Sequence, residues 1–411
     1  MKKICCYFIL LISIYQADAR TGNNDTAPII PGAERMGLYL PYLRNKNVAV
    51  FANQTSMIGG ENIVDTLIRL GIHVKVVFGP EHGFRGKADA GATVASYTDP
   101  ETGIQVVSLY GNKTRPSPQD LKGIDIMVYD IQDVGVRFYT FISSLQEYLE
   151  TALENKIPLL ILDRPDPNGS YIDGPVLDTA YRSFVGMQPV PVVYGLTPGE
   201  YALMIAGEHW LTGAANTAYR QHLSGSAFSL KVIPCANYSH HRPYHLPVKP
   251  SPNLPYMRSV YWYPSICFFE GTVMSEGRGT PYPFEIFGHP ELPSNLFRFE
   301  PHADAGAQDP KYRDKICYGW NITREPLPGH LELRWLLKAY QYYPDKAHFF
   351  LSPSASANRD PRAYFFNKLA GNDQLMKQIE EGLPEAAIRK SWQPALQQYK
   401  KIRKKYLLYP E

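Results

Sequence analysis

The sequence VKVVFGPEHGFRG at residues 74–86 contains the pattern that decides the fold. It begins with a mostly apolar run rich in β-branched side chains, which is typical of a buried strand. The run stops at a Gly-Pro pair, and Glu81, His82 and Arg85 follow it among glycines. Glycine permits positive φ angles and lets the backbone approach a ligand closely. Because ligands of open α/β sheets bind just past the carboxyl ends of the strands, the segment predicts a binding site there.

Glu81 and His82 form a candidate acid/base couple, since a carboxyl and an imidazole at a strand end can exchange protons with a substrate. The alternative is a polar turn whose charged groups are only solvated, as in most surface loops. Other strands of the chain end in the same way, which favours the catalytic interpretation.

Short apolar runs alternate with helical patterns through the first half of the chain. The runs lack an alternation of apolar and polar residues, so both faces of the strands are expected to be covered. Covered strands that alternate with helices are typical of a parallel sheet in a doubly wound α/β domain. The predicted strands occupy residues 47–52, 74–78, 104–109, 124–129, 159–162 and 230–233, and the clearest helices occupy residues 61–70, 141–155 and 197–211.

The composition changes after about residue 236, where proline and aromatic residues become dense. The strands expected here are short and mixed with turns, and the last segment has a helical pattern. Residues 20–236 are therefore predicted to form the α/β domain, and residues 237–411 a smaller α+β domain. The basic run KKIRKK at residues 400–405 is expected to be the solvated face of the terminal helix.

Residues 1–19 are predicted to be a signal peptide. A basic start, MKK, precedes an apolar stretch at residues 4–15 that is too short to span a bilayer. The triplet ADA at residues 17–19 is a suitable cleavage site. We therefore expect an exported protein, periplasmic or extracellular after removal of this peptide, with no stable membrane insertion.

Composition and missing motifs exclude several classes of function. The formal net charge of +3 is too small to indicate binding to nucleic acid. The chain has no G-x-G-x-x-G or Walker A pattern for nucleotides, and no G-x-S-x-G motif of serine hydrolases. Beyond residue 19, Cys235, Cys267 and Cys317 form no C-x-x-C pattern or Cys/His cluster. No metal and no cofactor are therefore expected.

Two further predicted strands end in charged segments, DIQDVGVRFYT at residues 130–140 and DRPDPNG at residues 163–169. Since the carboxyl ends of parallel strands lie side by side, the acids of these segments are expected to approach Glu81. Neighbouring carboxylates and burial both raise the pKa of a carboxyl group. A carboxyl that stays protonated near neutral pH is suited to general acid catalysis.

A structural interpretation of the same acids is the alternative. Arg137 and Arg164 can neutralise the aspartates of these segments in an ion-pair network that holds the loops. Asp130 or Asp133 can orient the imidazole of the Glu-His couple or hold sugar hydroxyls, or one of them can cap the following helix.

The segment FEGTVMSEGRGT at residues 269–280 repeats this arrangement in the second domain, with charges among glycines after an apolar run. Arg278 is a candidate for bidentate binding of a carboxylate. The alternative is a glycine-rich hairpin whose charges are solvated.

The segments at residues 78–86, 129–140, 163–169 and 269–280 together resemble the NamZ family, the YbbC-like exo-β-N-acetylmuramidases of glycoside hydrolase family 171. The resemblance implies a Rossmann-like N-terminal domain, a smaller C-terminal domain, and an active site in the cleft between them. It implies release of N-acetylmuramic acid from the non-reducing end of peptidoglycan fragments, and it places the catalytic glutamate of the family at Glu81. The implied partners are muramic-acid-containing saccharides.

A glycosidase needs a protonated carboxyl at the leaving oxygen, and Glu81 is our candidate. A second carboxylate then acts as nucleophile or base, or orients the 2-acetamido group of the sugar so that its oxygen attacks. The lactyl carboxylate of muramic acid requires a cation, for which Arg85, Arg137 and Arg278 are candidates. The alternatives to a glycosidase are a non-catalytic protein that binds cell-wall glycans, and a peptidoglycan amidase or esterase.

Two sets of residues are thus predicted to form the site. The catalytic set is Glu81, His82, Asp130 and Asp133, and the substrate-binding set is Asn53, Arg85, Gln132, Arg137, Tyr139, Asp163, Arg164, Asn168, Glu270 and Arg278.

Overall fold

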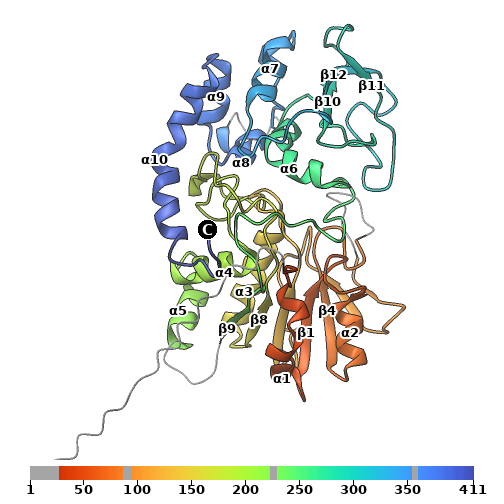
Figure 1. Ribbon diagram of the computed structural model, residues 1–411, viewed down its shortest axis with the longest axis vertical. Coiled ribbons are helices and arrows are strands. Elements are labelled where there is room, and N and C mark those ends of the chain that lie inside the picture. The colour runs from red at the N-terminus through yellow and green to blue at the C-terminus, as the bar shows by residue number, and fades with distance from the viewer. Residues whose placement is uncertain (1–26, 87–94, 223–228, 354–359) are drawn as a thin grey trace, which may run out of the picture.

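A seven-stranded sheet forms the lower half of the molecule in the computed structural model, which describes residues 27–86, 95–222, 229–353 and 360–411 (Figure 1). Six strands are parallel, and the short β5 pairs antiparallel at one edge. The strand order is β5-β6-β4-β1-β7-β8-β9. The doubly wound parallel sheet predicted from the sequence is therefore confirmed. The strands are β1 (Asn47–Ala52), β4 (His73–Gly79), β5 (Tyr97–Thr98), β6 (Gln105–Ser108), β7 (Ile126–Asp130), β8 (Leu159–Leu162) and β9 (Leu230–Ile233).

Helices cover both faces of this sheet, which explains why its strands are apolar on both sides. In β1, Val48 and Val50 pack in a cluster with α1 (Leu40–Leu43) and α2 (Ile63–Arg69). Ala49 and Phe51 point to the other face and join a larger cluster. Successive side chains of a strand point to opposite faces, so both clusters need apolar residues from the same run. The larger cluster is formed with α3 (Phe141–Glu154), α4 (Pro198–Gly207) and α5 (Gly213–His222).

The C-terminal part lies above the sheet domain in Figure 1 and contains a small antiparallel sheet of order β10-β12-β11. This arrangement confirms the α+β character predicted for the second half. Its elements are α6 (Met257–Ile266), β10 (Ile286–His289), β11 (Phe297–Phe299), β12 (Cys317–Asn321), α7 (Arg334–Tyr342), α8 (Phe365–Ala370), α9 (Gln374–Glu380) and α10 (Glu385–Arg403). A two-stranded ribbon, β2 (Met57–Ile58) with β3 (Glu61–Asn62), follows β1, and short 3₁₀ turns lie at Gly32–Glu34, Met36–Leu38, Thr179–Tyr181, Cys267–Gly271, Lys346–His348 and Pro361–Ala363.

One continuous apolar core joins the two parts. Phe138, in the segment after β7, packs edge-to-face against Tyr263 and Phe268 of the C-terminal part, with ring centroids 5.5 and 5.7 Å apart. The terminal helix α10 runs alongside the molecule and ends near the sheet domain (Figure 1). These aromatic contacts fix the position of the C-terminal part relative to the sheet domain.

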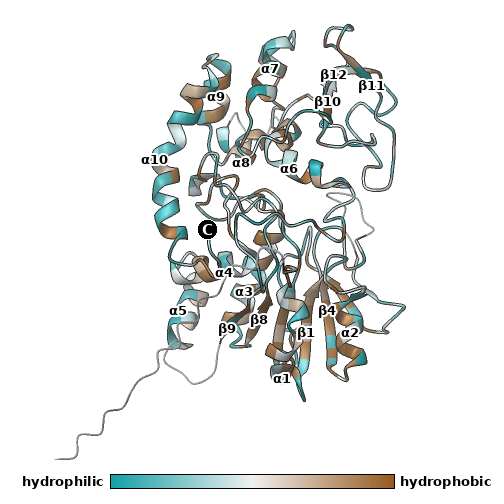
Figure 2. Cartoon of the chain, in the orientation of Figure 1, coloured by the Kyte–Doolittle hydropathy of each residue, from teal (hydrophilic) through white to brown (hydrophobic). Residues whose placement is uncertain are grey.

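Helix α10 is amphipathic, as its sequence predicts. Trp392, Leu396 and Tyr399 are buried, whereas most of the other residues are polar, so that the helix appears largely teal in Figure 2, unlike the brown strands of the sheet. The expected solvated basic run is wrong at Arg403, which is buried. Its Nε donates to the backbone oxygen of Gly195 at 2.6 Å, because the helix closes on the sheet domain there.

No helix within the described ranges is long and apolar enough to cross a membrane. The predicted signal peptide at residues 1–19 lies outside the described residues. Cys235, Cys267 and Cys317 are buried free thiols.

Candidate active site

A cavity of about 650 Å³ lies between the carboxyl edge of the sheet and the C-terminal part. Both parts of the chain contribute to its walls, so the site exists only when they are packed together. The sheet domain contributes Glu81, Tyr110, Phe138, Thr140 and Val185, and the C-terminal part contributes Tyr263, Glu270, Glu276, Arg278, residues 306–310 and Phe365.

Glu81 reaches this cavity through a tight turn at the end of β4. A side chain at Gly79 would bring its Cβ within 2.9 Å of the backbone nitrogen of Phe84, so the turn folds directly over the strand end. His82 has a φ of +68° and Gly83 a φ of +76°, both in the left-handed region. Such a φ is costly for most residues and free for glycine. The glycines of the motif thus permit the turn that brings Glu81 to the cavity.

Two hydroxyl groups hold the Glu81 carboxylate. Thr140 Oγ1, at the start of α3, donates to Glu81 Oε2 at 2.9 Å. The hydroxyl of Tyr110, which follows β6, also bonds to Glu81. Burial raises the pKa of Tyr110, and the charges of Glu81 and Glu270 raise it further, so the phenol remains a donor. The loops after three strands therefore converge on one carboxyl.

On the opposite wall, Arg278 lies between two glutamates. Its Nη2 is 2.6 Å from Glu270 Oε1, and its Nε is 3.2 Å from Glu276 Oε1. Burial alone would lower the pKa of Arg278, but the two carboxylates outweigh burial and raise it. Nη1 has no hydrogen-bond partner among the residues that the structure describes. One buried donor of a permanently charged group is therefore left unsatisfied in this wall.

Lys311 supports this wall from behind. Its Nζ lies 3.3 Å from Glu276 Oε2 and donates to the backbone oxygens of Phe269, Thr272 and Met274 at 2.8–3.0 Å. Burial would raise the pKa of Glu276, but the charges of Lys311 and Arg278 hold it below its usual value. Glu276 is therefore an ionised anchor for Arg278.

Asp130 and Arg164, at the ends of β7 and β8, form a buried bidentate ion pair instead of lining the cavity. Arg164 Nε lies 2.5 Å from Asp130 Oδ1, and Nη2 lies 2.9 Å from Oδ2. Burial would lower the pKa of Arg164, but the Asp130 charge outweighs this and raises it. The ion-pair alternative drawn from the sequence describes this part of the cluster.

Asp163 and Arg137 also fasten the framework. Asp163 accepts bonds from the Gly199 nitrogen at 2.8 Å, the Thr197 hydroxyl at 2.7 Å and the Tyr409 hydroxyl at 2.5 Å, and burial raises its pKa to about 7. Arg137 donates to backbone oxygens of residues 175, 190 and 369 at 2.6–2.9 Å. Arg137 binds carbonyl oxygens, not the carboxylates that the sequence suggested.

Asp133 is buried. It accepts bonds from the Gly135 nitrogen at 2.6 Å and from the Tyr194 hydroxyl. Burial raises its pKa to about 7, against the effect of these bonds. The structure thus places a carboxyl with a raised pKa here, as the sequence suggested, but outside the lining of the cavity.

The other expected residues form supports around the site. Arg85 lies on the sheet side, bound to Asp65 at 3.2 Å and to Asp99 at 2.8 Å, and stacked over Phe84. The remaining four residues form hydrogen bonds with neighbouring loops. Asn53 accepts a bond from the backbone nitrogen of Thr55, and Gln132 donates to the backbone oxygens of Asp133 and Pro165. Tyr139 donates to the backbone oxygen of Pro250, and Asn168 donates to the backbone oxygens of Val134 and Val260. His82 is buried in the turn and does not line the cavity. From the predicted sets, Glu81, Glu270 and Arg278 therefore share the cavity.

Sequence analysis missed Tyr110, Thr140, Glu276 and Lys311 as parts of the site. Tyr110 directly follows a predicted strand, so the same strand-end rule that selected Glu81 could have selected it. Thr140 and Glu276 lie inside quoted motifs. Lys311 carries no local signal, because its partners lie 35–42 positions earlier in the chain.

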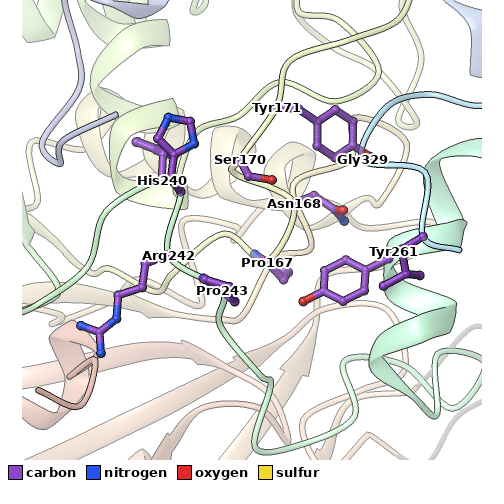
Figure 3. A pocket seen from close by; sticks show the side chains of 11 residues that line it. Pro167, Asn168, Ser170, Tyr171, His240, Arg242, Pro243, Tyr261 and Gly329 are labelled. Atoms are coloured by element: carbon purple, nitrogen blue, oxygen red, sulfur yellow. The ribbon is translucent and has the colours of Figure 1, made fainter. Parts of the chain in front are cut away.

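A second cavity, of about 290 Å³, lies between the loop after β8 and α6. Figure 3 shows the rings of Tyr171 and Tyr261 on one side of it, with Asn168 between them and His240 farther away. None of its described lining residues is a carboxylic acid. Of these two cavities, the larger one is the one lined by carboxylic acids.

One group in the described part of the chain has the composition of a metal site. Ligand atoms of His330, Glu332 and Glu385 lie within 4.8 Å of one another. Two of these side chains already accept hydrogen bonds from the backbone. Glu332 accepts from the nitrogen of Arg334 at 3.0 Å, and Glu385 accepts from the nitrogen of Leu333 at 3.3 Å. These bonds give the group a structural role, and it does not line the larger cavity.

A carboxyl group held by hydroxyls in a cleft between two parts of an α/β protein, with further carboxylates opposite, is the arrangement of a glycoside hydrolase. Comparison with known proteins agrees. The N-terminal model of the exo-β-N-acetylmuramidase NamZ matches residues 48–258, and the C-terminal model matches residues 261–409. The chain belongs to the NamZ family of exo-β-N-acetylmuramidases, which are glycosidases.

Individual relatives cover almost the whole chain. The peptidoglycan β-N-acetylmuramidase NamZ of Bacillus subtilis strain 168 is 35% identical over 396 residues, which are 90% of this chain and 89% of that protein. A crystal structure of a DUF1343 family protein from Bacteroides fragilis NCTC 9343 matches with a TM-score of 0.81 and 39% identity, over 94% of this chain and all of that one. A second such structure from the same organism has a TM-score of 0.74 and 26% identity, over 93% and 99%.

The two family models meet at the start of α6. The last strand of the sheet, β9, ends at Ile233. The domain boundary expected from composition, between residues 236 and 237, lies after the end of β9 and before the place where the two family models meet.

Proposed function

We propose that Glu81 is the general acid that releases N-acetylmuramic acid from the non-reducing end of peptidoglycan-derived saccharides. In this reaction the Glu81 proton passes to the glycosidic oxygen as the bond to the anomeric carbon breaks. The observation that carries the proposal is the position of its carboxyl, which lines the cavity and is oriented by Thr140 and Tyr110. Fixed orientation at the leaving atom is what general acid catalysis requires.

Glu270 is the second carboxylate of this proposal. It lines the same cavity from the C-terminal part, and its charge and that of Glu81 both act on the hydroxyl of Tyr110. Asp130 and Asp133 are held in buried bonds away from the lining, which favours Glu270 over the two acids chosen from the sequence. Glu270 either acts directly at the anomeric centre or orients the 2-acetamido group as the internal nucleophile.

Arg278 binds the lactyl carboxylate of muramic acid. Its guanidinium is anchored by two glutamates and keeps Nη1 for a ligand. Arginine recognises carboxylates through its planar set of donors, so this group distinguishes muramic acid from a sugar without the lactyl ether. The partners of the protein are thus anionic muramic-acid saccharides and not nucleic acid.

The protein acts outside the cytoplasm. The basic and apolar start of the chain, followed by ADA at residues 17–19, supports export to the periplasm or the exterior. Fractionation of cells that express the whole chain tests this. The protein is expected outside the cytoplasm with its mature N-terminus near Arg20, and retention in the cytoplasm with residues 1–19 intact contradicts export.

The leaving group tests the role of Glu81. An aryl β-N-acetylmuramide with an acidic phenol needs little protonation, whereas the disaccharide of muramic acid and N-acetylglucosamine needs full protonation. Glu81→Gln is expected to lower kcat on the disaccharide by about 10²- to 10⁴-fold, and on the aryl substrate by much less. The matched control is Glu381→Gln, which changes an exposed glutamate outside the cavity.

Three outcomes contradict the proposal. Equal losses on both substrates would assign Glu81 another role. Tight binding of the disaccharide without turnover by the unmodified protein would favour a binding protein. Release of acetate or peptide without muramic acid would favour an esterase or amidase.

A further inference from the structure

A third cavity, of about 450 Å³, lies beside helix α3, which is labelled in the lower half of Figure 1. We call it the α3 cavity. It is enclosed by α3, the segment after β6, the segment at residues 182–188 and the turn between α4 and α5. Its lining includes Arg115, Gln146, Arg182, Phe184 and Trp210. It shares no lining residue with the cavity that contains Glu81, so the function proposed for Glu81 assigns it no role.

The α3 cavity adjoins the catalytic cleft through one short segment. Val185 lines the cleft that contains Glu81, and its neighbour Phe184 lines the α3 cavity. The ring of Phe184 packs edge-on against Tyr110, with centroids 6.1 Å apart. The Tyr110 hydroxyl bonds to Glu81. A single pair of rings in edge-on contact therefore links the acid to the α3 cavity.

The length of α3 sets the distance between the two spaces. Thr140, which donates to Glu81, immediately precedes the helix, and Glu147 and Glu150 line the α3 cavity. At a rise of 1.5 Å per residue, these glutamates lie ~10–15 Å along the helix from Thr140. A saccharide whose glycosidic oxygen lies at Glu81 can extend over this distance.

Part of the lining of the α3 cavity offers apolar surfaces and one cation to a saccharide. Phe184 and Trp210 are partly exposed and offer flat apolar surfaces, on which sugar rings can pack. Arg182 is exposed, and its Nη2 donates to Gln188 Oε1 at 3.2 Å, which aims the guanidinium without neutralising it. Arg115, by contrast, is neutralised by three glutamates, Glu147 at 3.1 Å, Glu154 at 2.9 Å and Glu150 at 3.8 Å. Arg182 is thus the cation that the cavity offers to a ligand carboxylate.

We propose that the α3 cavity is the subsite for the sugars on the leaving-group side of the scissile bond, with Arg182 receiving the carboxylate of the next muramic acid. The proposal rests on the proposed function, which places the departing oxygen at Glu81. The enzyme then prefers fragments that continue past the first N-acetylglucosamine over fragments that end there.

Substrates of different length test this subsite. The specificity constant kcat/KM is measured on the aryl β-N-acetylmuramide, which has no leaving-group sugars, and on a tetrasaccharide that begins with muramic acid and contains a second one. Arg182→Ala and Trp210→Ala are each expected to lower kcat/KM on the tetrasaccharide roughly tenfold or more, and to leave the aryl substrate within twofold. The control is Arg298→Ala, an exposed arginine on β11.

A binding measurement separates this inference from the proposed function. Calorimetry with N-acetylglucosaminyl-muramic acid, the first two sugars of the leaving group, measures binding at the subsite in Glu81→Gln and in the double variant with Arg182→Ala. The loss of Arg182 is expected to weaken binding by tenfold or more. Failure of the unmodified protein to hydrolyse either substrate would overturn the proposed function, while Arg182-dependent binding would still support the subsite.

The inference is overturned if both variants retain the thermal stability of the unmodified protein and lose activity equally on both substrates. It is also overturned if neither variant loses activity on the tetrasaccharide, or if binding of the disaccharide is unchanged by Arg182→Ala.

Discussion

The ends of β4 and β7 carry acids of the same type in the same sheet, yet the two carboxyl groups have different surroundings. Glu81, after β4, lines a cavity and accepts bonds from two neutral hydroxyls. Asp130, the last residue of β7, is completely buried and bound by both arms of Arg164. A strand end thus brings acids together, but the partner determines their chemistry. A hydroxyl orients a carboxyl for proton transfer. At Asp130 burial raises the pKa, the Arg164 guanidinium acts against that rise, and the ion pair keeps the carboxyl away from a substrate.

The strongest test of this comparison is the separation of activity from stability at Glu81. Glu81→Gln is expected to lower turnover of the disaccharide by about 10²- to 10⁴-fold. Its free energy of unfolding is expected to change by only about 0.5 kcal/mol, since the amide keeps the shape of the side chain and its oxygen can still accept a hydroxyl bond. Steady-state kinetics and urea unfolding check the two values. Large destabilisation would mean that Glu81 is structural, as Asp130 is.

The opposite result is expected for Arg164. Arg164→Ala leaves the Asp130 carboxylate buried without its cation, which typically costs about 3–5 kcal/mol. Urea unfolding measures this, and the activity per folded molecule is expected to remain. The double variant with Asp130→Asn is expected to recover part of the stability, because it removes the uncompensated charge. An Arg164→Ala protein of normal stability and no activity would place this pair in the catalytic machinery.

A smaller effect is expected at Arg278, where charge and geometry can be separated. Arg278→Lys keeps the positive charge but loses the planar set of donors. We expect kcat/KM for muramic-acid substrates to fall roughly tenfold, mostly through KM, while hydrolysis of the matching N-acetylglucosaminide, weak from the start, is unchanged. The control is Arg298→Lys on β11. Equal losses on both sugars would remove Arg278 from recognition of the lactyl group.

The smallest effect concerns pH and Asp133. Burial raises the pKa of Asp133 to about 7, so between its ordinary value near 4 and about 7 the folded protein binds more protons than the unfolded chain. The protonated Asp133 carboxyl therefore contributes its full stabilisation below pH 4. This stabilisation falls by up to about 1.4 kcal/mol per pH unit as the pH rises, and it is lost above pH 7. The stability of Asp133→Asn relative to the unmodified protein should therefore increase from pH 4 to 7 and level off above. Urea unfolding across this range measures it, and a flat difference would mean that Asp133 is ionised throughout.

Local patterns predicted much of the architecture. The apolar runs without alternation predicted a sheet covered on both faces, and Val48 to Phe51 indeed face two separate clusters. The Thr-Pro-Gly-Glu sequence at residues 197–200 predicted the start of α4, which has the expected capping box. These features depend on neighbouring residues, so a single sequence is enough to recognise them.

The candidate site was predictable only in part. Glu81, Glu270 and Arg278 could be selected because each lies in a glycine-rich charged segment after an apolar run. Arg85 has the same local setting, but Asp65 and Asp99 draw it to the other side of the turn. Nothing near Arg85 in the sequence predicts these two partners.

The amino-acid sequence by itself determined the strands, the tight glycine turn after β4 and the family motifs, because backbone sterics and hydrophobic periodicity act between near neighbours. The tertiary structure decided which acid lines the cleft, which arginine is neutralised and where the α3 cavity adjoins the cleft. Those outcomes depend on burial and on charges brought together from distant parts of the chain, such as Lys311 beneath Glu276 or Tyr110 beside Phe184. Burial and charge pairing set the pKa and availability of a side chain, and both exist only after the two parts have packed.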